Sequence, residues 1–129
     1  MPRAERGDVL GWDLGGAHLK AARVTAAGRP VKVLQLPCRL WLGMEELDRA
    51  LDRAAAALGP CPRHAVTMTG ELADLFADRA AGVARLLAAF GRRFAGHAVV
   101  VYAGKAGFLP PARARRRVDD VASANFLAS

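Results

Sequence analysis

A glycine-rich run near the start of the chain, Asp13-Leu14-Gly15-Gly16-Ala17-His18-Leu19-Lys20, contains the residue types of a phosphate loop. Backbone N–H groups in a turn with two glycines can surround an anion. We therefore expect Gly15, Gly16 and Lys20 to contact phosphate, with Lys20 supplying a positive charge. Asp13 is a predicted ligand of Mg²⁺, which prefers oxygen. An ordinary hairpin also needs glycine at its turn, so the run alone leaves both interpretations open.

A second candidate segment, Thr67-Met68-Thr69-Gly70-Glu71, lies at the end of a predicted strand and at the start of a helical pattern. Open sheets bind ligands in the loops at the carboxyl ends of their strands. Thr69 is therefore a candidate ligand contact, and Glu71 a candidate general base or metal ligand. A helix cap at Thr69, and a first-turn carboxylate at Glu71, would explain the same residues without a ligand.

Two further candidates lie nearer the end of the chain. Gly104 and Lys105 follow an apolar run and can approach a phosphate, although the GxxxxGK[ST] spacing of a P-loop is absent. Asn125 falls on the apolar side of a final helical pattern that follows Asp119 and Asp120. Because a buried amide needs hydrogen-bond partners, we expect Asn125 to contact a bound ligand or to cap a helix.

Other catalytic patterns are missing from the sequence. The three histidines, His18, His64 and His97, have neither HxxxH nor HExxH spacing, which argues against a metal site built from them. No GxSxG motif for a nucleophilic serine is present. Trp12 and Trp41 are predicted to be core or interface residues rather than platforms for stacked bases.

Composition favours a single folded domain of 129 residues with free thiols. The net charge is +7, but sixteen of the nineteen basic residues are arginines, scattered except at 113–117, so we expect no nucleic-acid partner. Cys38 and Cys61 form no CxxC pair, and the sequence shows no signal peptide and no apolar stretch of membrane-spanning length. These features predict a cytoplasmic protein without membrane contact.

Hydrophobic periodicity predicts five strands and three helical stretches. Because a second strand follows the first directly, a Rossmann fold is disfavoured. Three hairpin-connected strands followed by alternating helices and strands predict an α/β fold with a mixed sheet, of the ribonuclease-H-like kind that forms a lobe of actin-like ATPases (sugar kinases, Hsp70). The last strand, apolar on both faces, is expected to be central. The strands are predicted at 8–13, 19–25, 31–36, 64–69 and 98–102, and the helical stretches at 44–58, from Glu71 to Phe94 with a bend or break, and after Pro111.

Several of these segments together resemble one family. They are Gly11-Trp12-Asp13-Leu14-Gly15-Gly16, Lys20, Met68-Thr69-Gly70-Glu71-Leu72-Ala73-Asp74, Tyr102-Ala103-Gly104 and Asp120-Val121-Ala122-Ser123-Ala124-Asn125. The set resembles the hydantoinase/oxoprolinase-related proteins of tetrahydromethanopterin-linked C1 transfer. This group includes the furan-methanamine synthase of methanofuran biosynthesis, which condenses a furan-methanol diphosphate with a glutamyl-tyramine and releases pyrophosphate. The resemblance spans nearly the whole chain, and the MTGELAD block is its most specific part.

The resemblance implies a transferase site. Asp13 would hold Mg²⁺, Gly15, Gly16 and Lys20 would bind the diphosphate, and Glu71 would accept the phenol proton of the tyramine unit. His18 departs from the small polar residue expected at its position. Family members continue into a second lobe with another Asp-x-Gly motif, which this chain lacks. The chain is therefore expected to be one amino-terminal lobe, residues 1–129, inactive alone and completed by a second lobe or partner chain.

Three alternatives stay open at this point. An ATP-dependent kinase or hydrolase of the same fold would use the same loop, with ATP as its cofactor. A nuclease of ribonuclease-H type would need several converging carboxylates for two metal ions, and the loop is instead rich in glycine. A non-catalytic fragment would only bind a partner lobe.

Overall fold

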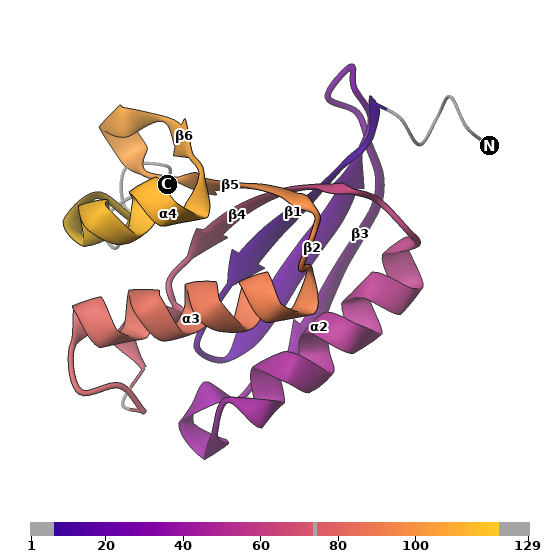
Figure 1. The fold of residues 1–129 in the computed structure, drawn as a ribbon. Coiled ribbons are helices and arrows are strands. Elements are labelled where there is room, and N and C mark those ends of the chain that lie inside the picture. The colour runs from indigo at the N-terminus through magenta and orange to yellow at the C-terminus, as the bar shows by residue number, and fades with distance from the viewer. Residues whose placement is uncertain (1–6, 74, 122–129) are drawn as a thin grey trace.

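The protein forms one mixed sheet with its helices on one side (Figure 1). The computed structural model describes residues 7–73 and 75–121. The strands are β1 (Val9–Leu14), β2 (His18–Val24), β3 (Pro30–Pro37), β4 (Arg63–Met68), β5 (Ala98–Tyr102) and β6 (Phe108–Leu109). The helices are α2 (Glu45–Leu58), α3 (Arg79–Arg93) and α4 (Pro111–Ala114), and the 3-10 turns are η1 (Leu40–Leu42), η2 (Gly70–Leu72), η3 (Gly104–Ala106) and η4 (Arg115–Arg117).

The six strands are ordered β3-β2-β1-β4-β5-β6. The first three form an antiparallel meander, whereas β4 and β5 run parallel to β1, and β6 returns antiparallel to β5. All five predicted strands are present within one or two residues of their expected bounds, and the α/β class with a mixed sheet is confirmed. Pro37 ends β3, which lies at the edge of the sheet as its proline predicted.

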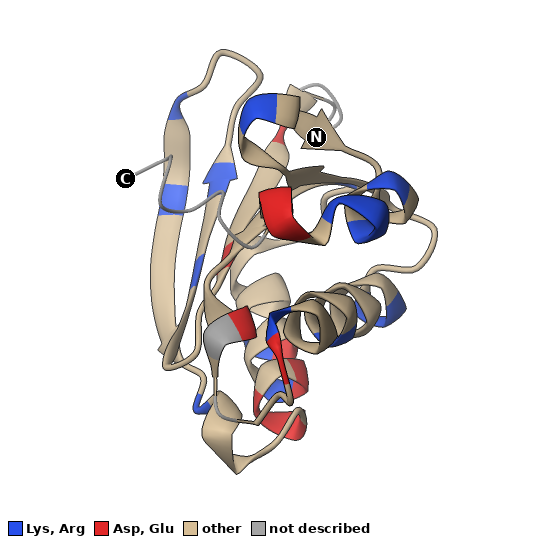
Figure 2. Cartoon of the chain, turned by 90° about the vertical axis from the view of Figure 1, so that its left-hand side faces the viewer, with Lys and Arg blue, Asp and Glu red and all other residues tan. Residues whose placement is uncertain are grey.

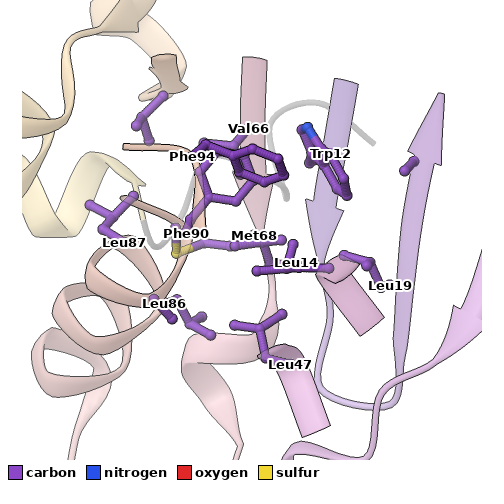
Figure 3. Close-up of a cluster of buried hydrophobic side chains, with 14 of the residues drawn as sticks. Trp12, Leu14, Leu19, Leu47, Val66, Met68, Leu86, Leu87, Phe90 and Phe94 are labelled. Carbon is purple, nitrogen blue, oxygen red and sulfur yellow. The ribbon is translucent and has the colours of Figure 1, made fainter. Parts of the chain in front are cut away.

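The core lies between the sheet and the two long helices. Along β1 the buried residues alternate, so that Leu10, Trp12 and Leu14 face the helices. Figure 3 shows this buried cluster, in which the Trp12 ring centroid lies 5.6 Å from that of Phe90 and 5.3 Å from that of Phe94. Figure 2 views the sheet from its edge and shows α2 and α3 on the same side of it. Among the described residues, the opposite face carries exposed apolar side chains, including Val33 at 70% and Phe108 at 56% exposure.

Two expectations about the elements are corrected, and one open alternative is decided. The fifth predicted strand is not central: β5 is fifth of six, and Val100 is 38% exposed on the uncovered face. The stretch from Glu71 to Phe94 forms two successive helical elements rather than one bent helix, because η2 ends after one turn and α3 begins only at Arg79. Thr69 precedes η2, but its side chain makes no capping hydrogen bond. The helix cap is Asp78, whose Oδ1 accepts from the Ala81 N–H at 2.8 Å.

Cys38 and Cys61 are buried free thiols, as their spacing predicted. Burial, followed by the charge of Glu46, raises the pKa of the Cys38 thiol to about 11. Within the described ranges, no helix is both long enough and apolar enough to cross a bilayer.

Candidate functional site

The two main sequence motifs meet at the carboxyl ends of β1 and β4. The Thr69 N–H donates to the Leu14 carbonyl at 3.0 Å, which joins the segment after β4 to the glycine hairpin. A Cβ placed on Gly15 would lie 3.6 Å from Thr69 Oγ1, and one on Gly70 would lie 3.0 Å from the Leu14 oxygen. The two loops are therefore in contact, and small residues at their interface make that contact possible.

The tip of the hairpin offers backbone donors at different residues from those expected. The Gly15 N–H already donates to the His18 carbonyl at 3.1 Å. The Gly16 and Ala17 carbonyls accept from Leu40 and Cys38, which fixes the tip against the chain before α2. The N–H groups of Gly16 and Ala17 donate to no group in the part of the chain that the structure describes. An anion at this turn would therefore be bound by Gly16 and Ala17 rather than by the Gly15 N–H.

Three buried oxygen atoms near these loops have no hydrogen-bond partner among residues 7–73 and 75–121. They are Asp13 Oδ1, Thr67 Oγ1 and Glu71 Oε2. Asp13 and Thr67 are paired across β1 and β4, and Lys20 is paired with Asp13 across β1 and β2, so the three side chains lie on the same face of the sheet. Unpaired buried oxygens are costly to a fold. Asp13 and Thr67 share one face of the sheet, and Glu71 is close enough to Asp13 to be affected by its charge.

Both carboxyl groups of the site resist ionisation. Burial raises the pKa of Asp13, and the positive charge of Lys20 partly opposes this. Burial also raises the pKa of Glu71 to about 7. The Glu71 backbone N–H and Arg79 lower it, and the charge of Asp13 raises it, so the two carboxyls repel each other when both are ionised. Carboxyl groups of this kind bind a cation readily, because its positive charge offsets both the cost of burying them in the ionised form and their mutual repulsion.

Glu71 is held in place by close packing against α3. A Cβ on Gly82 would lie 2.6 Å from the Glu71 carbonyl oxygen and 2.7 Å from its Cα. Only glycine at this position lets the helix approach the η2 turn so closely. This glycine packs against backbone, which has little freedom to move away.

Gly82→Ala is expected to destabilise the protein by about 1–3 kcal/mol, because the added methyl group overlaps the backbone of Glu71. Gly91→Ala in the same helix is the matched control, since a Cβ there meets nothing within 4 Å. It is expected to stabilise by up to about 1 kcal/mol through helix propensity. Urea unfolding of the two variants measures both values. Equal effects from the two substitutions would contradict the close contact.

The remaining predicted site residues are less well supported. Gly104 begins η3, where Ala103, Ala106 and Gly107 donate their N–H groups to carbonyls within the same turn. Gly104 follows β5, which lies two strands from β1 in the sheet, and its role stays a prediction. Asn125 lies outside the described residues. His18 is exposed at the start of β2, next to the hairpin tip.

Two shallow hollows on the uncovered sheet face meet at Gly11. One, of about 280 Å³, is lined by Asp13, Lys20 and Val33 among others. The other, of about 340 Å³, is mostly apolar and includes Thr67 and Tyr102. Gly11 lines both hollows and, having no side chain, does not separate them. Asp13 and Lys20 both border the first hollow, whose surface, like that of the second, is almost entirely apolar.

The site fits Mg²⁺ bound together with a phosphate better than a metal bound by protein alone. The described residues contain no group of three or more histidine, cysteine, aspartate or glutamate side chains placed to hold an ion. Mg²⁺ commonly uses only one or two carboxylates and completes its shell with water and phosphate oxygens. Asp13 Oδ1 is an unpaired oxygen suited to that role.

Comparison of the chain with models of known protein families and with curated proteins finds no match.

The structure also brings together two histidines that sequence spacing did not connect. The Trp12 indole N–H donates to His64 Nδ1 at 3.0 Å, and His64 Nε2 lies 2.8 Å from His97 Nδ1. Phe94 packs against the His64 ring at a centroid distance of 4.3 Å. Burial, then the charges of His97 and Arg93, lower the pKa of His64 to about 4, although the Cys61 backbone partly opposes them. Alternation along β4 placed His64 inward, but no local pattern predicted its partners.

Proposed function

We propose that this chain binds a magnesium-complexed phosphate or diphosphate at the carboxyl ends of β1 and β4. The proposal depends on two observations made among the described residues: buried oxygens of Asp13, Thr67 and Glu71 have no hydrogen-bond partner, and the N–H groups of Gly16 and Ala17 have no acceptor. Lys20, facing the same hollow as Asp13, adds a positive charge for the ligand. The strand order β3-β2-β1-β4-β5 with an antiparallel meander supports a ribonuclease-H-like lobe of the actin-like fold.

Each residue has a specific part in this proposal. Asp13 holds the cation, and Gly16, Ala17 and Lys20 bind phosphate oxygens, while Thr67 can orient a bound water. Mg²⁺ at this place would offset the negative charge that develops on a leaving diphosphate. Glu71, with its pKa of about 7, is suited to accept a proton near neutral pH. These parts are those of a transferase with a diphosphate leaving group, acting together with a second lobe.

The substrate follows only from the family resemblance. On that basis we propose a furan-methanol diphosphate condensed with a glutamyl-tyramine in methanofuran-type cofactor biosynthesis. An ATP-dependent kinase or hydrolase would use the same cation and the same hairpin. A chain that only binds a partner lobe would show no magnesium-dependent phosphate binding.

Isothermal titration of the chain with pyrophosphate is expected to show binding in MgCl₂ and at least about 10-fold weaker binding in EDTA, because the cation links Asp13 to the ligand. ATP titrated in the same buffer separates the two enzyme classes. Tighter binding of ATP than of pyrophosphate would favour the kinase or hydrolase. Heat changes absent with both ligands would contradict the proposed function.

A further inference from the structure

The three-ring chain from Trp12 through His64 to His97 has only one possible arrangement of protons. An indole N–H can donate but not accept, so His64 Nδ1 must be the acceptor and carry no proton. Neutral His64 therefore carries its proton on Nε2 and donates it to His97 Nδ1, 2.8 Å away. His97 must in turn carry its own proton on Nε2. Both imidazoles are thus held neutral, each in the same tautomer.

One added proton is incompatible with this arrangement. A proton on His64 Nδ1 would face the Trp12 N–H across 3.0 Å. A proton on His97 Nδ1 would face the His64 N–H across 2.8 Å. Either way two donors point at each other, and one hydrogen bond is lost. The His64 side chain is 2% exposed, so its ring is shielded from water while the hydrogen bonds to Trp12 and His97 are intact.

His97 is the member able to move. It is exposed, and it ends the short turn between α3 and β5. Its N–H donates to the Phe94 carbonyl at 3.0 Å, and the next residue, Ala98, donates to the Pro62 carbonyl at 2.8 Å. Rotation of the His97 side chain into water therefore breaks the ring chain without breaking the sheet. A hollow of about 300 Å³, lined by both His64 and His97, gives the ring room to turn.

The surrounding charges do not offset an added proton. Asp52 of α2 and Arg93 of α3 also line this hollow, but they pair with each other at 2.5 Å. Arg93 itself opposes protonation of His64. The Cys61 thiol donates to the Asp8 carbonyl, and the Asp8 carboxylate is paired with Arg23, so neither acid is directed at the imidazoles.

We propose that the Trp12–His64–His97 chain is a proton-operated switch, in which uptake of one proton breaks the hydrogen bond between His64 and His97 and lets the exposed His97 ring turn into water, next to the ring that accepts from the Trp12 indole. The switch does not depend on the proposed phosphate function. Acidification then displaces the His97 side chain at the turn where α3 leads into β5, while the sheet stays intact and before the whole domain unfolds.

Two measurements test the switch. Nitrogen–proton correlation spectra at pH 7.5 are expected to show His64 and His97 protonated only at Nε2. In a Trp41→Phe background Trp12 is the one remaining tryptophan of the sequence. Its emission is expected to change in one reversible step as the pH falls below 6.5, while the far-ultraviolet circular dichroism is unchanged.

His97→Asn in the same background is the control variant. Asparagine can still accept from His64, but it does not titrate, so the emission step is expected to move to lower pH. A step at the same pH in both proteins would overturn the proposal. So would a proton on His64 Nδ1 at pH 7.5, or an emission change that coincides with loss of circular dichroism.

Discussion

Asp13→Asn is expected to weaken magnesium-dependent pyrophosphate binding by about 10- to 100-fold while leaving the fold at least as stable as the wild type. The amide keeps the shape of the carboxylate but loses the negative charge that holds the cation. Burial opposes that charge, as the raised pKa of Asp13 shows, so its removal relieves a cost in the unliganded protein. Titration calorimetry with pyrophosphate and urea unfolding measure the two effects.

The opposite signs of these two effects are the informative result. Asp48→Asn is the matched control, because Asp48 is exposed on α2 and far from the hairpin in sequence. Asp48→Asn should change neither the affinity for pyrophosphate nor the free energy of unfolding appreciably. If Asp13→Asn lowers stability and leaves binding intact, the carboxylate has a structural role and the proposed cation site is wrong.

The second prediction with a large effect concerns the free energy of unfolding, to which Glu71 and His64 contribute with opposite pH dependences. Glu71 is more readily protonated in the folded state, with a pKa of about 7 against 4.5, so it reduces stability as the pH rises from 4.5 to 7. His64 is less readily protonated in the folded state, with a pKa of about 4 against 6.5, so it reduces stability as the pH falls from 6.5 to 4. Each shift corresponds to about 3 kcal/mol. The two contributions largely cancel between pH 4.5 and 6.5.

Substituting one of these two side chains should reveal the pH dependence of stability that the other contributes. Glu71→Gln is expected to gain about 3 kcal/mol of stability, relative to the wild-type curve, as the pH rises from 4.5 to 7. His64→Asn, which keeps an acceptor for the Trp12 N–H, should lose the same amount relative to wild type as the pH rises from 4 to 6.5. Urea unfolding at intervals of half a pH unit gives the difference curves. Parallel curves for all three proteins would show that neither group is held in its neutral form.

The order of elements along the chain was accessible from local patterns. Alternating apolar residues, the Gly15-Gly16 turn and the Gly59-Pro60 helix end each act over a few residues. For that reason β1 to β5 and α2 were predicted within one or two residues, whereas the two-residue strand β6 was not predicted. The segment from Glu71 to Phe94 was predicted less well, because Asp78 caps a new helix inside an apolar pattern that looks continuous.

The candidate site was predictable in part. Asp13, Lys20, Thr69 and Glu71 were each selected from their position at a strand end, and the parallel pairing of β1 with β4 brings them to one edge of the sheet. Which N–H groups remain unused was not predictable. That depends on the bonds from Cys38 and Leu40 to the hairpin carbonyls, across some twenty residues of sequence. Thr67 belonged to the second candidate segment but was given no role, because an unpaired buried hydroxyl can be recognised only once its surroundings are known.

Local patterns were enough to predict the α/β class, the positions of β1 to β5 and the glycine hairpin, because periodicity and turn chemistry act over a few residues. Which face of the sheet the helices cover, and the place of β5 near an edge, follow only from packing between distant segments. The tertiary structure also decided that Trp12, His64 and His97 form one chain, and that the carboxyls of Asp13 and Glu71 are buried near each other. Burial and pairing depend on residues distant in sequence, and both the pKa of a carboxyl and the tautomer of an imidazole follow from those surroundings.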